Sequence, residues 1–258
     1  MIEVNGLRKE FPLTRQHRKE LNTRDTVAIA VDDVSFECQP GRVFSLLGPN
    51  GAGKTTTLRM LSTIFKPSTG SIKIAGIDAV ENPREARKKI GFLTSSTGLY
   101  ARLTPNELIN YFADLYGINR EVTKKRRNEL YDLLDMHDFQ GKRIGKLSTG
   151  MKQKVSICRT MIHDPEVIVF DEPTSGLDVI TAENIIQLIR DCRNQGKTVI
   201  FSSHIMSEVD LLCDDMAIIH KGQILFNGTM ESFRSSMQEK SLTGEFIRIV
   251  NESKPQEA

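Results

Sequence analysis

The fold of this 258-residue chain is decided by the stretch Gly48-Pro49-Asn50-Gly51-Ala52-Gly53-Lys54-Thr55. A short apolar run at residues 43–47 precedes it, and apolar residues at helical spacing follow it until Pro67. Glycines let successive backbone N–H groups face one anion, and the start of a helix adds its positive end. The stretch therefore predicts a phosphate cradle, in which Lys54 reaches the β- and γ-phosphates of a nucleotide and the Thr55 hydroxyl binds Mg²⁺.

Two acidic residues directly follow a second apolar run. Asp171 and Glu172 come after residues 167–170, which have the composition of a buried strand. Ligands of open α/β sheets bind at the carboxyl ends of the strands. We therefore expect Asp171 to hold Mg²⁺ through water and Glu172 to act as the general base on an attacking water. His204 follows the apolar run 198–203 and is expected at the same edge, so the catalytic candidates are Lys54, Glu172 and His204.

Strand and helix patterns alternate along most of the chain. Strand patterns occur at residues 27–36, 43–47, 167–170, 198–202 and 216–220, and helical patterns at 54–64, 124–136 and 181–193. This alternation predicts an α/β fold with a mostly parallel sheet and helices on both faces. The helix-rich segment 99–162 interrupts that sheet; it holds a capping box at Thr104-Pro105-Asn106-Glu107 and a helix that begins near Ser148. We expect residues 2–11 as an edge strand and residues 12–26 as an exposed loop or extended hairpin.

The composition narrows the classes of function. Lysine and arginine number 35 against 33 acids, a net charge of +2, so nucleic acid is not expected as a partner. The four cysteines lie far apart without a C-x-x-C pair, which indicates buried thiols in a reducing compartment. No apolar run approaches the ~18–20 residues that span a bilayer. We expect a cytosolic protein whose membrane role, if it has one, is peripheral.

Three further segments carry a family resemblance. Residues 147–154, with the sequence Leu-Ser-Thr-Gly-Met-Lys-Gln-Lys, resemble the signature motif of ATP-binding cassette (ABC) ATPases. Residues 173–178 resemble the D-loop of that family, which ends at Asp178, and Ser202-Ser203-His204 resembles its switch histidine. With the cradle, these segments span nearly the whole chain in the family's order. The resemblance implies a P-loop NTPase fold with a RecA-like core, an inserted helical subdomain and a small N-terminal antiparallel β-layer.

The resemblance also implies ATP and Mg²⁺ as cofactors and a head-to-tail dimer with two ATP molecules in its interface. Each ATP then contacts the signature residues Ser148, Thr149 and Gly150 of the other subunit, where a serine hydroxyl and a helix N-terminus are suitable phosphate donors. Phe11 stands where the family places an aromatic ring on adenine; the alternative is a core residue of the first strand. The implied ATP-binding residues are Phe11, Gly48, Pro49, Asn50, Gly51, Ala52, Gly53, Lys54, Thr55 and Thr56.

The chain departs from the family pattern at two places. Thr149 replaces the usual second glycine of the signature, and Met151 stands where glutamine is common. Ser95 aligns with a glutamine that touches Mg²⁺ and is too short for the same direct contact, so a bridging water is expected there. We expect both departures to slow hydrolysis and to leave ATP binding intact.

The domain organisation follows from the same resemblance. We expect an ABC ATP-binding domain at 1–235, with a core of 1–94 and 163–235 and a helical subdomain at about 95–162, followed by an extension and tail at 236–258. Residues 91–100 and 148–154 look most like the ATPase subunits of sodium-efflux exporters. The resemblance implies a separate transmembrane permease that docks on the helical subdomain, a second copy of this or a similar subunit, and a place on the cytoplasmic face of the cell membrane.

The sequence disfavours three other classes of function. A soluble ABC ATPase of translation or DNA repair usually has two cassettes or a long coiled-coil insertion, and neither is found in this sequence. A P-loop kinase or GTPase does not explain the signature, and the guanine-reading motif Asn-Lys-x-Asp is missing. A binding module without catalysis is disfavoured by Lys54, Asp171, Glu172 and His204. The basic run 124–127 is interpreted as a solvated helix start.

Overall fold

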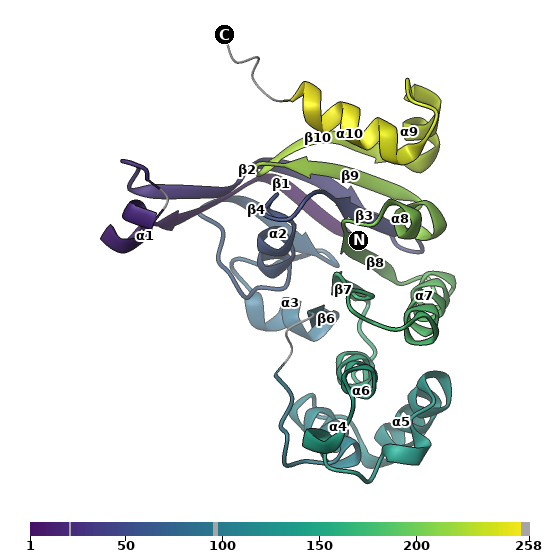
Figure 1. The fold of residues 1–258 in the computed structure, drawn as a ribbon. Coiled ribbons are helices and arrows are strands. Elements are labelled where there is room, and N and C mark those ends of the chain that lie inside the picture. Colours follow the sequence, from purple (N-terminus) through teal and green to yellow (C-terminus); the bar gives the residue numbers. More distant parts are fainter. Residues whose placement is uncertain (21, 95–97, 254–258) are drawn as a thin grey trace.

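The computed structural model describes residues 1–20, 22–94 and 98–253 (Figure 1). Within these residues, one sheet has six strands in the order β10-β9-β3-β8-β7-β6. Its strands are β3 (Val43–Leu47), β6 (Ile90–Thr94), β7 (Val167–Asp171), β8 (Thr198–Ser203), β9 (Asp215–His220) and β10 (Gln223–Thr229). Neighbouring strands run parallel except β10, which is antiparallel to β9. The prediction of an α/β fold with a mostly parallel sheet is confirmed.

The parallel strands are buried on both faces. In β3, Val43 and Leu47 belong to one apolar cluster, whereas Phe44 and Leu46 belong to another on the opposite face. Successive strand residues point to opposite faces, so a continuous apolar run supplies both clusters. Each fully buried Leu or Phe side chain contributes about 1.5–3 kcal/mol relative to an exposed one.

An antiparallel layer covers one of these faces. Within the described residues its order is β2-β1-β4-β5, formed by β1 (Ile2–Pro12), β2 (Val27–Cys38), β4 (Thr69–Ile74) and β5 (Ile77–Asp78). The predicted β-layer is confirmed, but the expectation that its first strand is an edge strand is wrong, because β1 pairs with both β2 and β4. The exposed segment between β1 and β2 contains a short helix, α1 (Arg15–Glu20), at the far end of the hairpin (Figure 1).

Helices cover the sheet and build the insertion. Those associated with the core are α2 (Lys54–Leu61), α3 (Pro83–Lys89), α7 (Val179–Asn194) and α8 (Met206–Leu212). The insertion, at the lower end of Figure 1, contains α4 (Pro105–Leu115), α5 (Arg120–Leu134) and α6 (Thr149–Met161), with two 3₁₀ turns at His137–Phe139 and Ile144–Lys146. The capping box is present: Thr104 Oγ1 accepts from the Glu107 N–H at 3.2 Å, and the Glu107 carboxylate accepts from the Thr104 N–H at 2.8 Å.

The C-terminal part forms two helices where the sequence pattern weakens. These are α9 (Met230–Ser236) and α10 (Leu242–Glu252), and α10 crosses the upper side of the core in Figure 1. Leu242, Phe246, Ile249 and Val250 of α10 pack against the main apolar cluster. All four cysteines are buried and free, as expected. In the described parts of the chain, no helix combines the length and apolar character needed to cross a membrane.

Candidate nucleotide-binding site

The predicted phosphate loop and the acidic and histidine residues predicted for catalysis meet at the carboxyl ends of three adjacent strands. The phosphate loop follows β3, Glu172 follows β7, and His204 follows β8. The register places Leu47 opposite Ser203, and Asp171 opposite Ser202. Because parallel strands end at one edge of their sheet, residues distant in sequence are brought side by side there.

Lys54 occupies the centre of the phosphate loop. Its side chain is only 4% exposed, and its Nζ donates to the carbonyl oxygens of Gly48 at 2.7 Å and Pro49 at 3.1 Å. Burial lowers the pKa of Lys54, and the Glu172 carboxylate, 3.5 Å away, opposes that shift. The loop surrounds a cavity of about 160 Å³ that is lined by Ala30, by residues 50–56 and by Glu172. Backbone donors and one cation thus surround a space suited to phosphate oxygens.

Two glycines of the loop are required by close packing. A Cβ atom on Gly48 would lie 2.3 Å from the carbonyl oxygen of Ile219 in β9. A Cβ atom on Gly53 would lie 2.6 Å from the carbonyl oxygen of Ala30, and Gly53 has a φ of +110°. The loop therefore fits against β2 and β9 only with glycine at these positions.

Asp171 is held by two hydroxyl groups. Its Oδ1 accepts from Thr55 Oγ1 at 3.0 Å and from Ser202 Oγ at 2.8 Å. Carboxylate and hydroxyl oxygens are hard donors of the kind that Mg²⁺ prefers, so Thr55 and Asp171 fit a magnesium site. Ser202 Oγ also accepts from the Glu172 N–H at 3.1 Å. This bridging role of Ser202 was not predicted, although the residue stands in the segment that presents the switch histidine.

Glu172 and His204 form a pair at the mouth of the site. His204 Nδ1 lies 3.3 Å from Glu172 Oε1, and the side chains are 41% and 24% exposed, so water can reach both. Glu172 has a φ of +49°, in the left-handed region that non-glycine residues rarely adopt. Such a backbone conformation costs about 1–3 kcal/mol at a non-glycine residue. The structure therefore brings Lys54, Glu172 and His204 together.

The signature residues lie at the start of α6. Ser148 is the N-cap, and its Oγ accepts from the Met151 N–H at 3.3 Å. Asp178 is the N-cap of α7; N–H donation by Thr181 lowers the pKa of its carboxyl group. A Cβ atom on Gly150 would lie 3.5 Å from Asp178 Oδ2, so the two helix starts are adjacent. Within the described residues, no hydrogen bond or ion pair joins the signature to the phosphate loop of the same chain.

Two predicted residues are not joined to this site. Phe11 is half-buried in β1, with its ring centroid 5.6 Å from that of Phe65 and 5.2 Å from Lys9 Nζ. It does not line the cavity of the phosphate loop. Ser95 lies outside the described residues, and its expected contact with Mg²⁺ through water stays a prediction.

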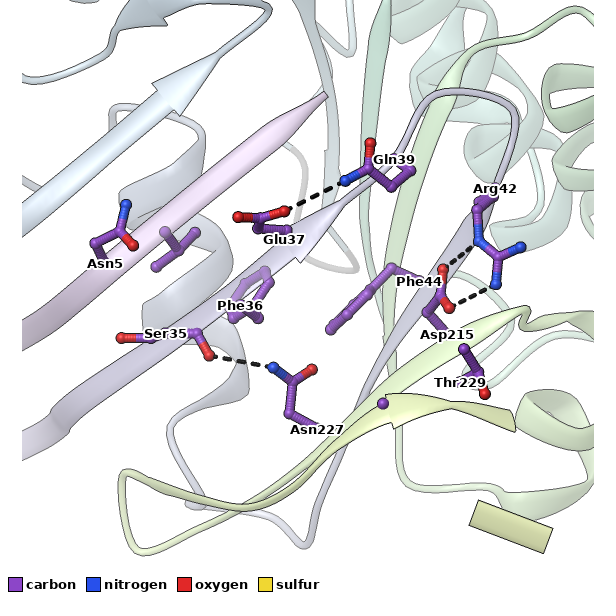
Figure 2. A pocket seen from close by; sticks show the side chains of 12 residues that line it. Asn5, Ser35, Phe36, Glu37, Gln39, Arg42, Phe44, Asp215, Asn227 and Thr229 are labelled. Atoms are coloured by element: carbon purple, nitrogen blue, oxygen red, sulfur yellow. Dashed lines mark hydrogen bonds and ion pairs between the residues drawn. The ribbon is translucent and has the colours of Figure 1, made fainter. Parts of the chain in front are cut away.

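A larger hollow lies at the opposite end of the strands (Figure 2). Its volume is about 630 Å³, and it is bordered by the residues that begin β3 and β9. Arg42 there donates to both carboxylate oxygens of Asp215, at 2.5 and 2.6 Å, as the dashed lines in Figure 2 show. The guanidinium group is thus already paired, and the hollow is a poorer phosphate site than the loop after β3.

The chain is similar to known proteins over most of its length. A family model described as ABC transporter matches residues 31–175. ABC transporter ATP-binding protein NatA of Bacillus subtilis (strain 168) is 42% identical over 230 residues, covering 89% of this chain and 94% of that protein. Nod factor export ATP-binding protein I of Burkholderia pseudomallei (strain 1710b) is 35% identical over 78% of this chain and 66% of that protein. A solved dimer of the ATP-binding cassette MJ0796, in a post-hydrolysis state bound to ADP and Pi, has a TM-score of 0.78 at 24% identity, with coverage of 89% and 99%.

Proposed function

Because this chain belongs to the ABC transporter family and is an ATP-binding, ATP-hydrolysing subunit of a transporter, we propose that the transporter is an exporter of sodium ions or of another solute. The observation that carries the ATP-hydrolysing role within this proposal is the single edge at which Lys54, Glu172 and His204 meet. Efflux is supported by the resemblance of residues 91–100 and 148–154 to sodium-efflux exporters and by a relative named for Nod factor export. The alternative, a soluble ABC ATPase, has no comparable support from the relatives.

The proposed chemistry assigns one task to each group. Residues 48–56 bind the phosphates of ATP, and Lys54 neutralises charge on them. Thr55 and Asp171 hold Mg²⁺, which neutralises phosphate charge when bound. Glu172 accepts a proton from the water that attacks the γ-phosphorus, the bond between that phosphorus and the β–γ bridging oxygen breaks, and ADP leaves. His204, 3.3 Å from Glu172 Oε1, orients this carboxylate. The water-accessible mouth between Glu172 and His204 supports this division of roles.

The second proposed feature is a head-to-tail dimer. Val179 and Ile180, directly after Asp178, are 85% and 76% exposed, and two adjacent apolar side chains that are this exposed favour their cover by a partner. The signature residues Ser148, Thr149 and Gly150 lie beside them on the adjacent helix start. We assign these residues to the ATP of a second subunit, as in the family resemblance. The MJ0796 cassette is known as a dimer, which is consistent with this proposal.

The proposed permease contact lies on the helical insertion. Tyr100, Tyr111, Leu115 and Tyr116 expose 56%, 47%, 62% and 40% of their surface around α4. Such a cluster of large apolar side chains is typical of a protein interface. We place the permease on this surface, and the subunit therefore on the cytoplasmic face of the membrane.

The test is affinity purification of the tagged chain from detergent-solubilised native membranes. We expect a multi-span membrane protein to co-purify with wild type and to be lost with Leu115→Glu. The matched control is Ile247→Glu, since Ile247 of α10 is 52% exposed on another part of the molecule. The co-purified complex in vesicles should then move ²²Na⁺ when ATP is added. Recovery of ribosomes or repair proteins without a membrane protein contradicts the transporter proposal, and ATP-driven transport without sodium movement contradicts only the substrate.

A further inference from the structure

Glu208, in the first turn of α8, joins two buried hydroxyl groups from different segments. Its Oε2 accepts from Ser203 Oγ at 2.8 Å, and its Oε1 accepts from Thr174 Oγ1. Ser203 is 2% exposed and Thr174 is 9% exposed. Hydrogen bonds from buried hydroxyls to a carboxylate are stronger than bonds between neutral groups, and their loss leaves unpaired buried donors.

The Ser203 bond fixes the turn that presents His204. Because the Ser203 hydroxyl donates its proton to Glu208, its lone pairs are directed elsewhere, and they accept from the Ile205 N–H at 2.9 Å. These hydrogen bonds hold the residues on either side of His204, Ser203 and Ile205, in a tight turn. The orientation of the turn after β8 therefore depends on the carboxylate of Glu208.

The Thr174 bond fixes the segment that follows Glu172. That segment is compact: the Ser175 N–H donates to the Glu172 carbonyl and the Leu177 N–H to the Thr174 carbonyl, both at 3.2 Å. The Pro173 carbonyl accepts from Gln153 of the signature helix at 3.3 Å. Glu208 thus links the histidine turn to a segment that also contacts α6.

The two hydrogen bonds of Glu208 join the segments at the points where they leave the sheet. Inside the sheet, Ser202 joins the ends of β7 and β8 through Asp171 and the Glu172 N–H. Past these residues the two segments leave the strands. Among the described residues, Glu208 is the one side chain outside the Glu172–His204 pair that bonds to both segments.

We propose that Glu208 is a positioning residue for ATP hydrolysis, which sets the spacing of His204 and Glu172 by clamping their two segments together. The inference rests on the proposed roles of Glu172 and His204. Glu208 has no contact with the phosphate loop among the described residues, so it acts on the hydrolytic step and leaves nucleotide binding to Lys54 and its neighbours.

The test measures kcat for Mg-ATP hydrolysis, the Kd for ATP and the Tm of purified full-length variants. Glu208→Ala should lower kcat about tenfold and leave the Kd for ATP within about twofold, because small misplacements of reacting groups are costly. Glu208→Gln keeps one acceptor oxygen and should fall between Glu208→Ala and wild type. The matched control is Asp210→Asn, which removes a carboxylate of the same helix whose one ion-pair partner among the described residues is Arg234, and it should retain wild-type kcat.

Two further variants separate positioning from general stability. Thr174→Val alone should lower kcat about threefold, and added to Glu208→Ala it should cause no further loss, since its acceptor is already gone. Thr174→Val and Glu208→Gln also decide the matter if Glu208→Ala does not fold. An unchanged kcat in Glu208→Ala, or a parallel loss of ATP affinity and Tm in Glu208→Gln, overturns the proposal. If Glu172→Gln and His204→Ala hydrolyse ATP at the wild-type rate, the proposed catalytic roles of Glu172 and His204 fail as well. If these two variants are inactive and Glu208→Ala is fully active, only the positioning role of Glu208 is overturned.

Discussion

The carboxylate oxygen Oε1 of Glu172 lies 3.3 Å from Nδ1 of His204, and the same oxygen lies 3.5 Å from Nζ of Lys54. One oxygen atom is therefore shared by the lysine that faces the phosphate space and the histidine at the mouth of the site. Lys54 also donates to two carbonyl groups of its own loop. A phosphate group that draws the ammonium group toward itself has to compete with Glu172 and these carbonyls.

Because one Glu172 oxygen faces both His204 and Lys54, Glu172→Gln should slow the hydrolysis of ATP without weakening its binding. Removal of a general base lowers kcat by about 10²–10⁴-fold. The Kd for ATP should stay equal or decrease, because a neutral amide competes less for Lys54. Phosphate release and equilibrium binding of ATP measure the two effects. In size-exclusion chromatography the ATP-bound dimer should persist longer than that of wild type; equal persistence shows that Glu172 is not the base.

The Thr55–Asp171 pair leads to a prediction about magnesium. Thr55→Val removes a hydroxyl that is 3.0 Å from Asp171 while keeping the shape of the side chain. The Mg²⁺ concentration for half-maximal hydrolysis should rise about tenfold, as expected when one hydrogen-bonded partner of a metal site is lost. Thr55→Ser, which restores the hydroxyl, is the control. An equal rise in both variants shows that the hydroxyl has no part in binding Mg²⁺.

The parts of the fold and of the site that could be predicted from the sequence are those whose residues lie close together in the chain or directly after a strand. The phosphate loop is local in sequence, and the positions of Glu172 and His204 follow from their placement after strands of one parallel sheet. By contrast, the clamp by Glu208 depends on rotamers and on packing of α8, which no sequence pattern encodes. The inner position of β1 depends on its pairing with β4, about 60 residues later, and a single strand pattern does not reveal whether one or both edges are paired. The helix α10 was missed although Leu242, Phe246 and Ile249 have helical spacing, because Gly244 and several β-branched residues lower the helix propensity of the segment.

Gly48 allows a test of the loop's packing against β9. In Gly48→Ala the new Cβ would meet the Ile219 carbonyl oxygen at 2.3 Å, which is backbone and has little room to move. We expect a loss of about 1–3 kcal/mol in the free energy of unfolding and a marked loss of ATP affinity. Gly141→Ala is the control, since a Cβ there meets nothing within 4 Å. Chemical denaturation and ATP titration of both variants decide the matter; wild-type affinity in Gly48→Ala means that the loop has more freedom than its contacts indicate.

Phe11 allows a test of adenine stacking. If its ring stacks on the base, Phe11→Ala should weaken ATP binding by about 0.5–1.5 kcal/mol and reduce the preference for ATP over GTP. If the ring is only a packing partner of Phe65, as its edge-on contact in the structure allows, nucleotide affinity should stay constant. Phe11→Tyr retains a stacking ring and is the control. Titrations with ATP and GTP distinguish these cases.

The hydrogen bonds of Glu245 lead us to expect that acid destabilises the C-terminal helix α10. Its side chain is 2% exposed; one oxygen accepts from Arg248, and the other accepts from Arg248 and from the N–H groups of Gln238 and Glu239. The Arg248 guanidinium group and then these N–H groups lower the pKa of Glu245 from 4.5 to about 2. Protonation removes acceptors for donors that hold the connection between α9 and α10.

The direction of the pH effect on stability follows from the difference in the pKa of Glu245 between the folded and the unfolded chain. A carboxyl group with a lowered pKa in the folded state adds stability that is complete above about pH 4.5 and is lost as the pH falls toward 2. Amide hydrogen exchange of α10, corrected for the intrinsic effect of pH, should therefore accelerate between these values. Glu245→Gln should show the fast exchange already at pH 7, whereas Glu231→Gln, a control at an exposed residue of α9, should follow wild type. Slow exchange of α10 in Glu245→Gln at pH 7 would show that Leu242, Phe246 and their apolar neighbours alone hold the helix on the core.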